Sequence, residues 1–118
     1  MREEPVSYTH LDVYKRQVIA RIAGLTAVDC SGIVGMAAKN MKDGLVQLLK
    51  RESLTKGIRI NVNEEQISID LHIIVEYGTN ITAIAENIIS TVKYKVETVC
   101  GIAVEQVNVF VEGVRVDA

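Results

Sequence analysis

The residues best suited to chemistry are His72 and Asp70, which lie two positions apart in the segment ISIDLHIIVE. Side chains at i and i+2 of a β-strand share a face, so a strand here would place both on one surface. Such a pair can act as a general base when a nucleophile lies beside it. No plausible nucleophile accompanies this pair, so we expect no catalytic residues and interpret His72 as part of a solvated or partner-facing surface.

A second motif, Gly32-Ile33-Val34-Gly35, matches the GXXG loop with which KH domains clamp a nucleic-acid backbone. Lys39 and Lys42 follow closely, but the two central residues are apolar, and a tight turn of the chain explains the glycines equally. A KH-like nucleic-acid-binding module therefore stays as the alternative function, and nucleic acid is not the expected partner.

The two cysteines, Cys30 and Cys100, lie seventy positions apart without a CxxC spacing or histidine companions. This pattern indicates neither a zinc site nor a disulfide framework, and favours small core thiols. No P-loop or paired-carboxylate motif is present either. We therefore expect no cofactor, no metal site, no small-molecule substrate and no enzymatic activity.

Composition indicates an acidic protein with an aliphatic core. The net charge is -2, hydrophobic residues make up 48% and aromatic residues 4%, with no Trp and a single Phe. The sequence has no block of Lys and Arg residues that would predict binding to nucleic acid or to a membrane surface. No leader and no apolar run of about eighteen residues is visible. We expect a cytoplasmic location.

The segment VSYTHLDVYKRQ, residues 6–17, differs from the apolar pattern that follows it. Permitted codons for these residues form a string that is nearly its own reverse complement, and this string resembles two transposase adapters of sequencing libraries joined back to back. We interpret residues 1–17 as a non-native segment and residues 18–118 as a single domain. Resequencing the source locus tests this interpretation.

Apolar periodicity predicts the remaining elements. Helical spacing over 18–28 gives a first helix, with Asp12 as a possible cap in the segment before it; 32–38 reads as a brief strand or link, 40–50 as a short helix, and 51–57 as a polar loop. Alternation over 58–62 and 67–75 gives a β-hairpin. A long helix over 81–99 follows, with Thr79 or Asn80 as its cap and Gly101 as its stop, then a strand over 107–111 that ends before a turn at Gly113.

These elements predict an α+β fold, with a small mixed or antiparallel sheet of three to four strands and two main helices packed on one face. The other face would be open. Its polar residues, together with two apolar ones, form a candidate interaction surface of Asn61, His72, Ile74, Asn108 and Phe110.

Three blocks, VIARIAGLTA, IDLHIIVEYGTNI and VNVFVEGVRV, together resemble the alkaline shock protein family, which are small envelope stress response proteins of Gram-positive bacteria. The resemblance runs from Val18 to the C-terminus. It implies a cytoplasmic protein of cell-envelope homeostasis that forms a homo-oligomer or binds a membrane-anchored protein partner, and it implies no catalytic residues. We therefore expect a structural or adaptor protein.

Overall fold

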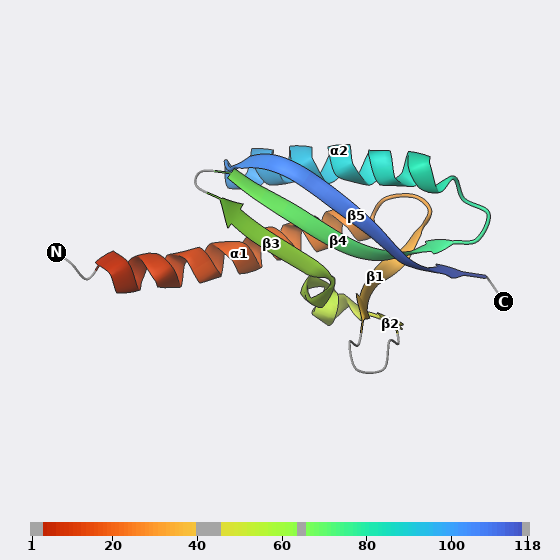
Figure 1. The fold of residues 1–118 in the computed structure, drawn as a ribbon, viewed down its shortest axis with the longest axis horizontal. Coiled ribbons are helices and arrows are strands. Elements are labelled where there is room, and N and C mark those ends of the chain that lie inside the picture. The colour runs from red at the N-terminus through yellow and green to blue at the C-terminus, as the bar shows by residue number, and fades with distance from the viewer. Residues whose placement is uncertain (1–3, 40–45, 64–65, 117–118) are drawn as a thin grey trace.

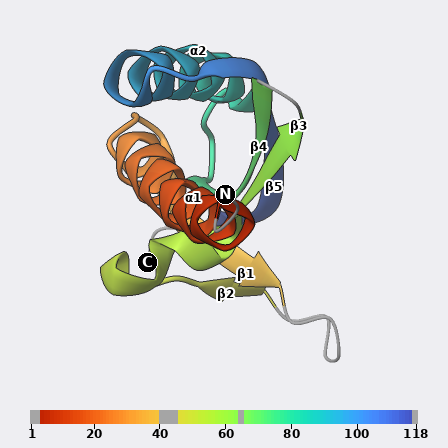
Figure 2. The ribbon, with the colours of Figure 1, turned by 90° about the vertical axis from the view of Figure 1, so that its left-hand side faces the viewer.

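The protein folds as two helices on one face of a five-stranded sheet, which confirms the α+β prediction (Figures 1 and 2). The computed structural model describes residues 4–39, 46–63 and 66–116. In chain order the elements are α1 (Glu4–Val28), β1 (Ile33–Lys39), β2 (Val46–Leu48), the 3-10 helix η1 (Arg51–Gly57), β3 (Ile58–Asn63), β4 (Gln66–Glu76), α2 (Ile81–Cys100) and β5 (Ala103–Arg115).

Strand β4 lies at the centre of the sheet. One of its edges pairs with β5, in parallel, from Gln66 to Glu76. Its other edge pairs antiparallel with β3 over 66–71 and with β1 over 73–75, and β2 pairs with β1. Strands β3 and β1 therefore lie end to end along one edge of β4. The outer edge of β5 has no strand partner among the described residues.

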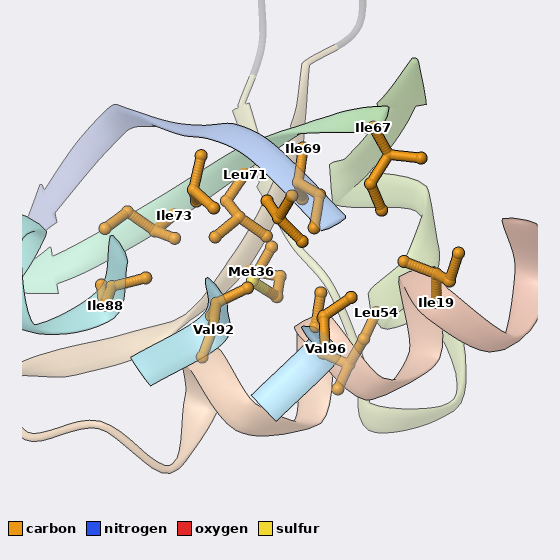
Figure 3. Packing of buried hydrophobic residues seen from close by; sticks show 14 of the residues in the cluster. Ile19, Met36, Leu54, Ile67, Ile69, Leu71, Ile73, Ile88, Val92 and Val96 are labelled. Carbon is orange, nitrogen blue, oxygen red and sulfur yellow. The ribbon is translucent and has the colours of Figure 1, made fainter. Parts of the chain in front are cut away.

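The core lies between the sheet and the helices, and its side chains follow the period-two alternation of β4 (Figure 3). Five β4 side chains that face the helices are at most 3% exposed: Ile67, Ile69, Leu71, Ile73 and Val75. Three fully buried residues of α2 pack against them, one helical turn apart: Ile88, Val92 and Val96. Helix α1 adds mostly small residues, Ile19, Ala23 and Ala27, which let it approach closely. The predicted aliphatic core is confirmed.

Both ends of α2 form as the sequence predicts. Asn80 is the N-cap, and its side-chain oxygen accepts a hydrogen bond of 3.0 Å from the backbone N–H of Ala83. Gly101 ends the helix with φ +69°, a conformation that glycine adopts without strain, and its N–H donates to the carbonyl of Glu97. Helix α2 is thereby fixed at the two points where it joins β4 and β5.

Several local predictions are wrong. The sequence predicts a short helix over 40–50, but residues 46–48 form a strand, because pairing with β1 overrides the helix signal. Residues 40–45 lie outside the described residues. The additional strand makes the sheet larger than the predicted three to four strands. The expected polar loop at 51–57 is η1, which buries Leu54. Gly113 lies inside β5, not in a turn. Helix α1 begins at Glu4, so Asp12 is interior and not a cap.

Candidate interaction site on the open sheet face

The face of the sheet away from the helices holds an open groove of about 480 Å³. We call it the open-face groove. It is lined from η1, β1, β3, β4 and β5 by Ala37, Ala38, Lys56, Ile58, Arg59, Asp70, His72, Phe110 and Glu112. Its volume is within the range of about 300–1,000 Å³ that is typical of ligand sites, although the groove is too open to enclose a small molecule.

The groove exists because β4 changes partners there. Leu71 is the last β4 residue that pairs with β3, and Ile73 is the first that pairs with β1. His72 lies between them, at the junction where the pairing of β4 with β3 stops and its pairing with β1 starts. The small side chains of Ala37 and Ala38 border this junction, so the surface stays hollow beside His72.

His72 is fixed by contacts to two residues of β5. Its ring stacks on Phe110, with ring centroids 4.9 Å apart and planes 16° from parallel. Its Nδ1 donates to Oε2 of Glu112 at 2.7 Å. Glu112 lies two residues beyond Phe110 on β5 and so shares the open face with it. The β4–β5 pairing is irregular at this point, since Val111 pairs with Ile73 and Gly113 with Ile74, which leaves Glu112 without an opposite residue on β4. The aromatic stack thus has one preferred orientation.

The charged residues of the groove fall into two groups. Asp70 accepts a hydrogen bond of 2.9 Å from the side-chain amide of Asn108, and Glu112 accepts one from His72, so both carboxylates have partners. Lys56 and Arg59 are exposed, and among the residues that the structure describes neither forms a hydrogen bond or an ion pair. The η1 and β3 end of the groove therefore carries two cations that are available to a ligand.

The structure brings together three residues of the predicted interaction surface, His72, Phe110 and Asn108, either in the groove or hydrogen-bonded to it. Asn61 is exposed on the same face, opposite Ser68, but does not line the groove. Ile74 is only 4% exposed and offers no surface. It pairs with Gly35, and Leu48 lies directly over that glycine, since a Cβ on Gly35 would be 2.9 Å from Leu48 Cδ1.

Sequence reasoning missed Glu112 and Lys56. Strict alternation from Phe110 would have placed Glu112 on the open face, but the predicted strand ended at Val111. The predicted interaction surface also leaves out Arg59, although it includes Asn61 on the same face. Lys56 has no signal, because only the placement of η1 beside β3 brings it to the groove. His72 and Asp70 lie on the same face, as alternation predicts, and each hydrogen-bonds to a separate residue of β5, Glu112 and Asn108.

The GXXG segment does not form an exposed loop. Gly32 lies in a turn with φ +86°, but Gly35 is buried inside β1 and pairs with Ile74. Four residues that enter a strand in this way cannot surround a nucleic-acid backbone. Lys42 lies outside the described residues.

Both cysteines are partly buried and unpaired. Desolvation raises the pKa of the Cys30 thiol, with a further contribution from the carboxylate of Asp29, and desolvation alone raises the pKa of Cys100. A raised pKa lowers the thiolate fraction at neutral pH and makes a thiol a poor nucleophile. Within the described residues, no cluster of three or more His, Cys, Asp or Glu side chains could hold a metal ion.

Comparison with known proteins identifies the family. The sequence pattern of the alkaline shock protein 23 family, which is described as having a cell envelope-related function, matches residues 7–116. The chain belongs to this family. It is the same family that the three sequence blocks resemble, and the match begins inside the segment that we interpret as non-native.

Two of the relatives that resemble the chain are named as uncharacterized proteins. The chain is 49% identical to the uncharacterized protein YloU of Bacillus subtilis (strain 168) over 110 residues. The aligned region covers 92% of this chain and 91% of that protein. It is 35% identical over 100 residues to the uncharacterized protein Spy1614 of Streptococcus pyogenes serotype M6, covering 84% and 83%.

A third relative carries a functional name. The chain is 31% identical to a stress response regulator gls24 homolog of Streptococcus pyogenes serotype M3 over 105 residues. The aligned region covers 86% of this chain and 57% of that protein. No solved structure matches the chain. Among the described residues, no helix has the length and apolar character needed to cross a membrane.

Proposed function

We propose that this member of the alkaline shock protein family is a non-enzymatic structural or adaptor protein of the cell-envelope stress response. It acts in the cytoplasm, at the inner side of the membrane, by forming homo-oligomers or by binding a membrane-anchored protein. The cell envelope-related description of the family and the stress response relative support the cellular role.

The observation that carries the mechanism is the exposure of β5. This strand is 13 residues long and pairs on one edge only within the described part of the chain. Three of its residues and Val116, the first residue after it, expose large apolar side chains: Phe110 (44%), Val111 (36%), Val114 (50%) and Val116 (66%). An unpaired edge with apolar side chains is a common site for strand addition or face-to-face association.

The chemistry of the groove supports a binding role over catalysis. The histidine hydrogen-bonds to a carboxylate and stacks on a phenylalanine, and none of the described residues that line the groove has a hydroxyl or thiol side chain. A general base without a nucleophile or an oxyanion site has no reaction to promote.

Sedimentation at several concentrations tests the proposal, with Phe110→Arg compared with Tyr94→Arg. Both changes replace an exposed aromatic residue by arginine, but Tyr94 lies on α2 and is 70% exposed, on the other side of the sheet. We expect Phe110→Arg alone to weaken self-association or capture of the membrane-anchored partner. Equal behaviour of the two variants in both assays would contradict the proposal.

A further inference from the structure

We propose that the open-face groove binds a short segment of a protein partner in which an acidic residue lies next to an apolar or aromatic one. This inference rests on the proposed function and adds the chemistry of the partner. The acidic residue pairs with Lys56 and Arg59, and the apolar side chain covers Phe110.

The acidic residue follows from the charges of the groove. Arg59 lies opposite Asp70 in the β3–β4 register, yet the two side chains form no ion pair. Asp70 is instead hydrogen-bonded to Asn108, on the β5 side. The guanidinium of Arg59 and the ammonium of Lys56 are therefore both free to meet an incoming carboxylate, and a guanidinium can bind it with two parallel hydrogen bonds.

The apolar residue follows from Phe110. Its ring is 44% exposed, and the stacked imidazole of His72 extends the flat surface. Because Glu112 holds His72, the surface is already ordered before a partner arrives, which lowers the entropic cost of binding. Across the groove, Ala38 is only partly buried and is small enough to leave room for a side chain.

The remaining charges exclude a polyanion. Asp70 lies on β4 opposite Arg59, and Glu112 lies on β5 at the far side of the groove. A nucleic-acid backbone that crossed the groove would bring phosphates toward these carboxylates. A peptide can instead place a single carboxylate at the cationic end, which favours a protein partner over nucleic acid.

A synthetic peptide with blocked ends tests the proposal. It carries one Asp-Leu pair in a neutral Gly/Ser background, and matched peptides carry Lys-Leu or Asp-Ser. The full chain with His10→Gln has one histidine, so the imidazole NMR signals of His72 report on the groove directly. We expect saturable shifts with Asp-Leu, weaker ones with Asp-Ser, none with Lys-Leu, and weaker binding at higher salt.

Variants locate the binding. Lys56→Gln combined with Arg59→Gln should weaken Asp-Leu binding about tenfold, since both charge-assisted contacts are lost. Lys93→Gln combined with Lys95→Gln is the matched control, because it removes two exposed cations from α2, behind the sheet. Lys56→Gln alone, which leaves the sheet unchanged, should give an intermediate loss and guards against misfolding of the double variant.

Three results would overturn the inference: no His72 shift at millimolar Asp-Leu peptide, equal binding of Lys-Leu, or tighter binding of an oligothymidylate than of Asp-Leu. If the peptide fails while Phe110→Arg still abolishes association of the protein, the partner chemistry is wrong and the proposed function stands. If Phe110→Arg leaves every association unchanged, the proposed function fails as well.

Discussion

His72 and Glu112 are 40 residues apart in the sequence, and the structure places His72 Nδ1 2.7 Å from Glu112 Oε2. Only the fold brings them together. The contact depends on the parallel β4–β5 pairing, which sets His72 opposite Phe110 and close to Glu112, two residues further along the same face, and it fixes the imidazole on which the exposed ring of Phe110 stacks. The open face is therefore an ordered surface.

A double-mutant cycle on His72→Ala and Phe110→Ala measures this order. We expect a coupling free energy of about 0.5–1 kcal/mol in urea unfolding, the lower part of the range for aromatic pairs, because both rings are partly exposed. Glu112→Gln should reduce the coupling, since the imidazole loses its anionic acceptor. Additive single effects would mean that the rings do not stack in solution.

The core depends on α2, and Ile88→Asp tests it. Ile88 is fully buried against β4, so a carboxylate there would lose its water without gaining a partner. We expect a loss of more than about 4 kcal/mol in the free energy of unfolding, close to the whole stability of a small domain, and no cooperative thermal transition. Tyr94→Asp, at an exposed position of the same helix, should melt like the wild type.

Two glycines with nearly equal φ separate backbone strain from steric clash. Gly32 (φ +86°) and Gly78 (φ +85°) both require a left-handed backbone, which costs about 1–2 kcal/mol for alanine. At Gly78 an added Cβ meets nothing within 4 Å, whereas at Gly32 it would clash with Ile84 Cδ1. Gly32→Ala should therefore cost about 1–3 kcal/mol more than Gly78→Ala in urea unfolding. Equal costs would show that Ile84 yields freely.

The two thiols give a pH-dependent prediction. Burial raises the pKa of both Cys30 and Cys100 in the folded state, so the unfolded chain loses its thiol protons first as pH rises. Stability from this source is present below the unfolded pKa and declines above about pH 8.5. Alkylation by iodoacetamide at pH 8 should be slower in the native protein than in urea. Equal rates would contradict the raised values.

The sequence predicts the elements whose patterns are long and regular. The alternation of β4, the apolar stripe of α2, and the Asn80 and Gly101 signals all agree with the structure, because burial of one face imposes these periods. Strand β2 could not be predicted, because its three residues are too few to show a period and only pairing with β1 defines it. Helix η1 could not be predicted, because only the burial of Leu54 defines it. The proposal that residues 1–17 are non-native stays a prediction.

The candidate site was partly predictable for the same reason. Phe110, His72, Asn108 and Glu112 share a face by simple alternation, whereas burial of Ile74 under the β1–β2 corner depends on the pairing of β1 with β4 and β2. The groove itself arises where two strands meet end to end along β4, and no local pattern encodes that junction.

The most direct test of the central claim is photo-crosslinking in living cells, with a benzoyl-phenylalanine placed at position 110 or, as the matched control, at position 94. The account predicts that the probe at 110, on the open sheet face, forms defined covalent adducts with a second copy of the chain or with one membrane-fraction protein, and that the probe at 94 does not. Identical adduct patterns at the two positions, or none at 110, would contradict an interaction role for this face.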